Sequence, residues 1–305
     1  MTEDSDGITQ GSVEANGLTF GYLAAGDLDD RGTPLALCLH GFPDSAWTWR
    51  HLLPTLAAAG YRVVAPWLRG YAPTTVPEDG HYQSAVVALD ACALHAALGG
   101  GDDAVLIGHD WGALASYAAV HHEGTTWRRL VAMAVPHPSA LSTAFFSYDQ
   151  LQRSWYMFFF QHPLADVAVP MDDLAFLDRL WADWSPGYDA TADLPRVKDA
   201  LRGPANLAAA IGYYRATLGG VGLDPSPEVA ALDAAAAGPP PLPTLYLHGR
   251  DDGCMGADLA GLSAAALTHP GSRVDVVPEA GHFLHLEQPE IVNRMVLEFL
   301  DPSGG

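Results

Sequence analysis

The chain of 305 residues contains 49% hydrophobic residues and carries a formal net charge of −21, with Lys198 as its single lysine. A chain of this length and apolar content can bury the core of one enzyme-sized domain. A surface of such negative charge repels phosphate backbones and anionic lipid headgroups, which argues against nucleic acid and membrane partners.

The cysteines and the amino terminus indicate the compartment. Cys38, Cys92 and Cys254 are scattered without CxxC spacing, so we expect buried free thiols and neither a disulfide framework nor a zinc site. Residues 1–10 are acidic, whereas a secretory signal begins basic and then becomes apolar. The sequence also lacks a run of about 18 apolar residues, the length of a membrane span. We therefore expect a cytoplasmic protein.

The first predicted elements are strands with one helix between them. Residues 12–26 alternate around an Asn-Gly pair, which predicts a β-hairpin. Two aliphatic runs follow, at 35–39 and 62–67, and they read as buried strands. The segment 45–59 between them predicts a helix.

The same rhythm continues in the next part of the chain. A helix is predicted over 82–98 and a second over 112–122, and these alternate with aliphatic strands at 104–108 and 130–135. Continuous aliphatic strands that alternate with helices are typical of a parallel sheet covered on both faces.

The alternation stops after the sixth of these strands. Residues 139–223 contain aromatic and helical patches without a comparable strand, which predicts a helical insertion. The Ala/Pro-rich stretch 233–243 is expected to be a linker. Strands are predicted again at 244–249 and 273–278, followed by a final helix over 289–300.

The predicted fold class is therefore α/β, with a mostly parallel sheet flanked by helices and a helical cap inserted after the sixth strand. We assign residues 1–138 to the first part of the core, 139–235 to the cap and 236–305 to the second part of the core. Ligands of open parallel sheets gather beyond the carboxyl ends of the strands, so candidate site residues are sought there.

Three strand ends carry chemically suggestive groups. The strand near 105–107 leads into residues 108–112, GHDWG, and Asp252 and His282 follow the last two strands. The segment 105–112 resembles a nucleophile elbow, because a strand, a sharp turn and a helix follow one another and glycines flank the central Asp110. Asp110, Asp252 and His282 also follow one another in the chain order of nucleophile, acid and histidine in a hydrolase triad. Each residue alone has a simpler interpretation: Asp110 as a helix N-cap, Asp252 as part of a solvated turn and His282 as a loop histidine. Their joint occurrence favours catalysis.

An aspartate at the elbow indicates a particular reaction. A serine that attacked an alkyl carbon would form an ether, which activated water could not cleave. A carboxylate forms an ester instead, and water activated by His282 can hydrolyse that ester. Asp110, with a reference pKa near 3.9, is ionised at neutral pH without a base. Asp252 would then orient His282.

Ester hydrolysis passes through a tetrahedral oxyanion that needs hydrogen-bond donors. The backbone N–H of Trp111, directly after the nucleophile, is one candidate. The backbone N–H of Phe42, in the HGFP segment after the strand 35–39, is the other.

With these motifs the chain resembles the epoxide hydrolase family of α/β-hydrolases, which is related to the haloalkane dehalogenases. The resemblance rests on HGFP, GHDWG, the Asp252 loop, GHFLHLEQPE and the inserted cap, and it covers about residues 10–300. It implies a cofactor-independent and metal-independent hydrolase whose partners are a small apolar epoxide and water. The oligomeric state, monomer or homodimer, stays open.

The resemblance also implies two cap tyrosines that assist the departing epoxide oxygen. SWYMFFFQHP places Tyr156 at the first position and GYYRATLG places Tyr214 at the second, with Tyr213 as its close neighbour. A phenol stays protonated at neutral pH and can donate this hydrogen bond. Both tyrosines, with Trp111 and Phe42, are expected to line the substrate site. Packing in aromatic-rich helices is the alternative role of the tyrosines.

The aromatic cluster Phe145, Phe146 and Phe158–Phe160 predicts either cap-to-core packing or an apolar substrate tunnel.

Other functions stay open. A haloalkane dehalogenase would share the Asp nucleophile, although Phe42 stands where such an enzyme often has Asn. A fluoroacetate dehalogenase would have Arg in place of Trp111. A non-catalytic ligand-binding protein could also reuse the fold.

Overall fold

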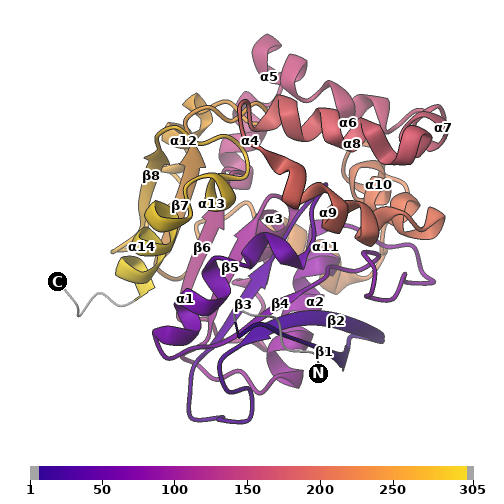
Figure 1. Ribbon diagram of the computed structural model, residues 1–305. Coiled ribbons are helices and arrows are strands. Elements are labelled where there is room, and N and C mark those ends of the chain that lie inside the picture. The colour runs from indigo at the N-terminus through magenta and orange to yellow at the C-terminus, as the bar shows by residue number, and fades with distance from the viewer. Residues whose placement is uncertain (1–6, 301–305) are drawn as a thin grey trace.

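The computed structural model describes residues 7–300, and its centre is an eight-stranded sheet in the order β1-β2-β4-β3-β5-β6-β7-β8 (Figure 1). The strands are β1 Thr9–Ala15, β2 Leu18–Ala25, β3 Leu35–Leu39, β4 Arg62–Pro66, β5 Val105–His109, β6 Arg129–Met133, β7 Thr244–Gly249 and β8 Arg273–Val277. Strand β2 is antiparallel to both of its neighbours, and the other pairs are parallel. The predicted, mostly parallel sheet is confirmed. The acidic residues 1–6 lie outside the described part.

The predicted hairpin is confirmed, and its turn has a simple backbone origin. Asn16 and Gly17 both have positive φ, at 44° and 72°, which a two-residue turn that matches the strand twist requires. The turn sets Ala15 opposite Leu18.

Helices cover both faces of the sheet, as predicted. The elements of the core are the 3₁₀ helix η1 Ala46–Trp49 and the α-helices α1 Leu52–Ala58, α2 Ser84–Ala97, α3 Trp111–Ala119, α12 Asp258–Ser263, α13 Leu284–Glu287 and α14 Pro289–Leu300. Helix α1 packs against α14 on one face, and α2 packs against α3 on the other (Figure 1). The strands between them are almost wholly buried.

The structure corrects two of the predicted elements. The single helix predicted over 45–59 is broken, because Pro54 has no N–H and its ring would clash with the carbonyl of residue 50 in a continuous helix. The linker predicted over 233–243 begins later, because its alanine-rich start completes helix α11, which ends at Ala235.

A long helical segment separates β6 from β7, in agreement with the predicted insertion after the sixth strand. Its elements are α4 Pro138–Ala144, α5 Tyr148–Arg153, α6 Trp155–Phe159, α7 Ala165–Ala168, α8 Met171–Trp184, η2 Ala190–Ala192, α9 Leu194–Leu201, α10 Pro204–Gly219 and α11 Pro227–Ala235. Most of them lie beyond the carboxyl ends of the strands (Figure 1), whereas α11 packs against α2 and α3. The domain boundaries proposed at 138/139 and 235/236 stay predictions.

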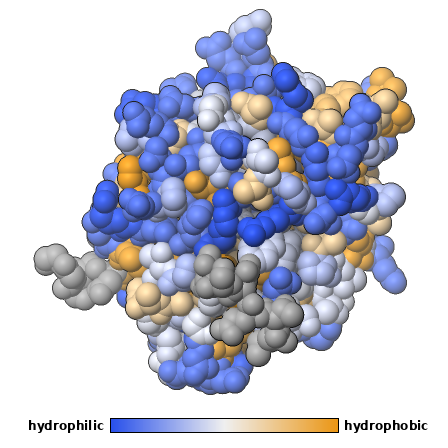
Figure 2. Space-filling view, viewed as in Figure 1, coloured by the Kyte–Doolittle hydropathy of each residue, from blue (hydrophilic) through white to orange (hydrophobic). Residues whose placement is uncertain are grey.

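The surface is mostly hydrophilic and carries an exposed apolar patch. Figure 2 shows a mostly hydrophilic face with hydrophobic side chains gathered over α7 and the start of α8, where Leu164, Val167 and Met171 are exposed. Within residues 7–300, none of the helices combines the length and the hydropathy that a membrane crossing requires.

Candidate active site

Asp110 lies on the sharp turn between β5 and α3, at the carboxyl edge of the sheet. Its backbone has φ 53° and ψ −118°, a sparsely populated conformation for a residue with a side chain. A Cβ on Gly108 would lie 2.3 Å from the carbonyl oxygen of Gly112, and one on Gly112 would lie 2.1 Å from that of Leu39. Only glycines therefore fit on both sides of Asp110. Its side chain makes no capping hydrogen bond to the helix, which removes the simple N-cap interpretation.

The Asp110 carboxylate is buried and faces two partners. Oδ1 accepts a hydrogen bond of 2.8 Å from the backbone N–H of Phe42, and Oδ2 lies 3.6 Å from His282 Nε2. Burial by itself would raise the pKa of Asp110, but the hydrogen bond and the charge of His282 outweigh burial and lower it. The carboxylate is therefore ionised at neutral pH, as a nucleophile must be.

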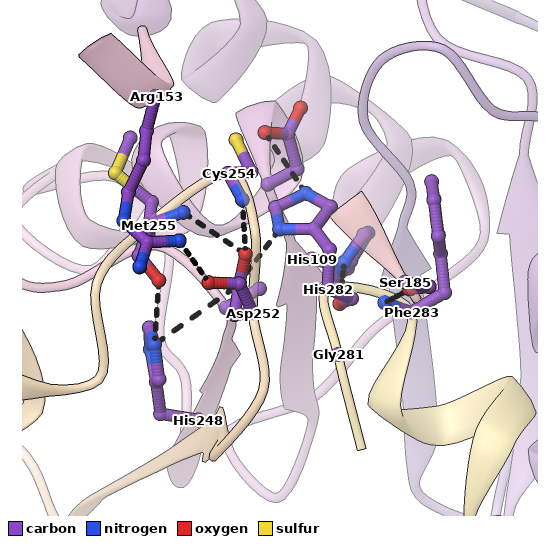
Figure 3. Close-up of polar contacts among 12 residues, drawn as sticks. His109, Arg153, Ser185, His248, Asp252, Cys254, Met255, Gly281, His282 and Phe283 are labelled. Atoms are coloured by element: carbon purple, nitrogen blue, oxygen red, sulfur yellow. Dashed lines mark hydrogen bonds and ion pairs between the residues drawn. The ribbon is translucent and has the colours of Figure 1, made fainter. Parts of the chain in front are cut away.

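The sequence-predicted acid and histidine lie together on the adjacent loops. His282 Nδ1 is 3.0 Å from Asp252 Oδ2, and the other carboxylate oxygen accepts the backbone N–H groups of Cys254 at 2.7 Å and Met255 at 2.9 Å (Figure 3). Burial alone would raise the pKa of Asp252, whereas the charge and hydrogen bond of His282 lower it. Asp251, the neighbouring carboxylate, is exposed and is not part of this arrangement.

His282 lies between two carboxylates, and this sets its protonation. Burial would lower the pKa of the imidazole, but the charge of Asp252 and the interactions with Asp110 raise it to about 10. The resting imidazole is therefore protonated at neutral pH. A change that neutralised Asp110 would remove one of the two charges that hold the proton, and so would lower the pKa of His282.

The helical insertion contributes a main-chain group that links the loops of Asp252 and His282. The carbonyl of Trp184, at the end of α8, accepts the backbone N–H of Gly253 and that of His282, both at 3.0 Å. A Cβ on Gly253 would lie 1.9 Å from the Asp183 carbonyl oxygen, so this approach requires glycine. Sequence patterns could not identify this link, because it uses backbone atoms far apart in the chain.

Two further buried histidines lie next to the site and make contacts outside it. His109 Nε2 is 2.9 Å from the carbonyl oxygen of His282, so this ring holds the histidine loop in place. His285 is buried, and its Nε2 lies 2.6 Å from Thr48 Oγ1, away from Asp252. These contacts indicate a structural role for His285. Sequence patterns did not identify His109, because its contact is with a main-chain atom.

The two predicted cap tyrosines converge on the elbow. Tyr156 on α6 and Tyr214 on α10 are 1% and 2% exposed, and their ring centroids are 5.5 Å apart. The Tyr214 ring lies 5.0 Å from the ring of Trp111 and 5.1 Å from that of Phe42. Burial raises the pKa of both phenols well above its usual value, so both hydroxyls keep their protons. The neighbouring Tyr213 instead donates to the carbonyl of Arg69 at 2.9 Å.

The hydroxyls of the two tyrosines differ in their surroundings. Tyr156 Oη is 3.4 Å from the sulfur of Cys254, which sequence analysis had taken only as a buried free thiol. Tyr214 Oη and the Trp111 indole nitrogen make no hydrogen bond of good geometry among residues 7–300, although the indole is close enough to interact with the phenol. Both of these groups can therefore donate to a ligand.

The aromatic cluster has split roles. Phe160 is fully buried and its ring contacts those of Phe42, Tyr156 and Tyr214, so it packs the cap on the core. Phe146 is 73% exposed. Side chains of the helical insertion and of the neighbouring core form a pocket of about 280 Å³, which is lined among others by Phe145, Phe146, Leu114, Met157, Thr217 and Leu218.

Among residues 7–300, two triplets of buried side chains have donor atoms close enough to hold a metal ion. They are Asp44, His109 and His285, and Asp252, Cys254 and His282, each with its donor atoms within 4.8 Å of one another. In the second triplet the side chains of Asp252 and His282 already form a hydrogen bond with each other. The expected independence from metals and cofactors stays a prediction.

Comparison with known proteins places this arrangement in a family. The sequence model of the protein family described as "alpha/beta hydrolase fold" matches residues 34–289. The chain belongs to the α/β-hydrolase family. This α/β-hydrolase is 30% identical to the AB hydrolase superfamily protein YfhM of Bacillus subtilis, over 97% of the chain and 99% of that protein.

Other relatives of the α/β-hydrolase are named epoxide hydrolases. Epoxide hydrolase A of Mycobacterium tuberculosis is 30% identical over 96% of the chain and 97% of its own length. Human epoxide hydrolase 4 is also 30% identical, over 94% of the chain and 77% of its length. The solved structure of epoxide hydrolase A from Mycobacterium thermoresistibile has a TM-score of 0.78 at 25% identity, covering 96% of the chain and 98% of its own. The α/β-hydrolase is thus a hydrolase of the epoxide hydrolase kind.

Proposed function

We propose that this α/β-hydrolase converts an apolar epoxide to a vicinal diol through a covalent ester on Asp110. The observation that carries the proposal is an ionised carboxylate on the elbow beside a group of packed rings that includes Trp111, Tyr156 and Tyr214, with both phenols buried and protonated. The relatives named epoxide hydrolases support the same reaction.

In the first step an oxygen of Asp110 attacks a ring carbon of the epoxide. A carbon–oxygen bond forms, the ring carbon–oxygen bond breaks, and its electron pair goes to the departing oxygen. Tyr156 and Tyr214 donate hydrogen bonds to that oxygen, which is a poor leaving group without a proton. Asp110 needs no base for this step, because its pKa is already lowered by His282.

In the second step water hydrolyses the ester. Esterification removes the negative charge of Asp110, so the pKa of His282 falls below its resting value of about 10 and the imidazole can release its proton, which balances the proton that the opened epoxide oxygen takes up. The neutral imidazole, oriented by Asp252, then takes a proton from water as the water oxygen attacks the ester carbonyl carbon. The backbone N–H groups of Phe42 and Trp111 stabilise the oxyanion. As the oxyanion collapses, the bond between the carboxyl carbon and the diol oxygen breaks, the diol oxygen takes the proton of the added hydroxyl, and Asp110 returns to a carboxylate beside protonated His282.

The position of the first of these amides supports this role. The N–H of Phe42 donates to Asp110 Oδ1 at 2.8 Å, the carboxylate oxygen that would become the oxyanion. Its ring, with those of Trp111, Tyr156 and Tyr214, forms an apolar wall that suits an apolar substituent on the epoxide.

The alternative that shares the nucleophile is a haloalkane dehalogenase. The unpaired Trp111 indole N–H could donate to a halide, but the residue after HisGly is Phe42, which has no side-chain donor. A ligand-binding homologue without turnover is the alternative from another class. Incubation with an aryl epoxide and, separately, a bromoalkane distinguishes the three: we expect a diol and no bromide. Bromide release would favour the dehalogenase, and binding without any product the non-catalytic homologue.

The tyrosines separate catalysis from packing. Changing both Tyr156 and Tyr214 to Phe should slow epoxide opening by about 10² to 10⁴, the usual contribution of a general acid. The rings and their packing are kept, so the loss would report the hydroxyl protons. The measurement is single-turnover ring opening, followed by loss of the epoxide.

Tyr213→Phe is the matched control for the tyrosine variants. Its hydroxyl bonds to the Arg69 carbonyl and not to the site, so we expect ring opening close to the wild-type rate and a loss of about 1 kcal/mol in stability. Near-normal ring opening in the double variant would assign Tyr156 and Tyr214 to packing alone.

A further inference from the structure

We infer that Cys254 is a positioning residue for ring opening, whose thiol donates a hydrogen bond to Tyr156 Oη and so leaves the phenol proton directed at the departing epoxide oxygen. The inference rests on the proposed function. Its starting observation is the 3.4 Å distance between Cys254 Sγ and Tyr156 Oη, with the two side chains 0% and 1% exposed.

The contact joins two segments that are held independently of the thiol. The backbone N–H of Cys254 donates to Asp252 Oδ1, and its carbonyl accepts the side-chain amide of Gln150 at 2.9 Å. From the same stretch of the cap, Arg153 Nη1 donates to the Asp252 carbonyl at 2.8 Å. These hydrogen bonds hold the loop 252–255 against α5, which directly precedes α6. The sulfur and the phenol oxygen therefore meet at a fixed distance.

Either atom of this contact could be the donor, and we assign the thiol as the donor from a count of protons. Tyr156 has one hydroxyl proton, and Cys254 Sγ is the only partner that its oxygen has among residues 7–300. If the phenol donated to sulfur, its proton would be turned away from the substrate. Burial raises the pKa of Cys254 well above its usual value, so the group stays an S–H donor and not a thiolate acceptor.

The same hydrogen bond assists the reaction as it proceeds. Negative charge develops on Oη while the phenol proton moves toward the departing oxygen, and a thiol proton that points at Oη stabilises this charge. Tyr214 is the natural comparison, because its hydroxyl is equally buried and, among the described residues, makes no hydrogen bond to the Cys254 thiol. Cys254 should therefore act through Tyr156 and not through Tyr214.

A double-mutant cycle tests this pairing. Cys254→Ala should slow single-turnover ring opening by about 3- to 10-fold, the loss of one modest hydrogen bond. In a Tyr156→Phe background the same change should have little further effect, whereas in a Tyr214→Phe background the full loss should persist. Hydrolysis of the preformed ester should keep its rate, because the backbone bonds of residue 254 to Asp252 and Gln150 do not need the thiol.

Two more measurements separate positioning from a general packing effect. Cys254→Ser restores a hydroxyl donor and should recover part of the ring-opening rate, which Cys254→Val should not. The S–H stretching band of Cys254, assigned by difference against Cys254→Ser, should move to higher frequency in Tyr156→Phe, where the acceptor is gone, and stay in place in Tyr214→Phe.

The outcomes separate this inference from the proposed function. A wild-type protein that forms no diol would overturn the proposed function, and the S–H band would still report the hydrogen bond. If the wild type forms diol while Cys254→Ala matches its ring-opening rate, or costs the same factor in the Tyr156→Phe background, only the role of Cys254 is overturned. An unchanged S–H band in Tyr156→Phe contradicts the donor direction.

Discussion

Asp110→Asn should abolish epoxide turnover, with a loss of about 10⁴-fold or more, as expected when a catalytic nucleophile is removed. The amide keeps the size of the side chain and can still accept the Phe42 N–H, so the elbow should fold normally. It cannot supply the ionised oxygen that attacks the ring carbon. The measurement is diol formation at saturating epoxide, with circular dichroism and thermal unfolding to verify the fold.

Asp251→Asn provides the control for this substitution. It removes one exposed carboxylate from the loop that carries Asp252 and should leave turnover unchanged, because Asp251 is not part of the catalytic arrangement. Substantial turnover by Asp110→Asn would contradict the assignment of the nucleophile. A complementary measurement uses a single turnover of the wild type in ¹⁸O-labelled water. Label in Asp110 and not in the diol indicates ester hydrolysis at the carboxyl carbon, and label in the diol would indicate direct attack of water on the epoxide.

His282→Gln should stop the reaction at the ester and make the intermediate accumulate. Glutamine can still donate a hydrogen bond to Asp110, so ring opening is expected to continue. It cannot accept a proton from water at neutral pH, so we expect ester hydrolysis to slow by about 10² to 10⁴, the range for loss of a general base. Intact mass should show one adduct of the whole epoxide, and peptide mapping should locate it on Asp110.

His122→Gln, at a half-buried histidine in the turn after α3, is the control, and it should turn over without a stable adduct. The substrate that forms the adduct distinguishes epoxide hydrolysis from dehalogenation. An adduct of the whole epoxide on the His282 variant supports epoxide hydrolysis, whereas an alkyl adduct formed only from a bromoalkane would mean dehalogenation. A folded variant that neither reagent labels would favour the ligand-binding alternative.

Local patterns predicted the architecture because they act over short distances. Five-residue aliphatic runs such as 105–109 are buried on both faces of a sheet, and the Asn16–Gly17 pair takes the positive φ values that a tight hairpin needs. The errors came from single residues that act against a broad pattern. Pro54 breaks the helix predicted over 45–59, and the alanines before the proline run complete α11 where a linker was predicted.

Residue types and their order also limited the candidate site. A carboxylate between two glycines after a buried strand, followed by an acid and a histidine after later strands, led to the hypothesis of an ester mechanism. The roles of Asp110, Asp252, His282 and the cap tyrosines stay predictions until the experiments are done. Their proximity, with distances of 3.0 Å and 3.6 Å from His282 to the two carboxylates, agrees with that hypothesis.

The sequence by itself therefore determined the elements, their alternation, the family resemblance and the residue types that could react, since all of these depend on local chemistry and order. Only the tertiary structure decided which groups meet. It placed the thiol of Cys254 against Tyr156, the Trp184 carbonyl between Gly253 and His282, and His109 behind the histidine loop. The physical reason is that these contacts join atoms up to 173 residues apart, often in the main chain, whose meeting depends on how the cap packs on the sheet.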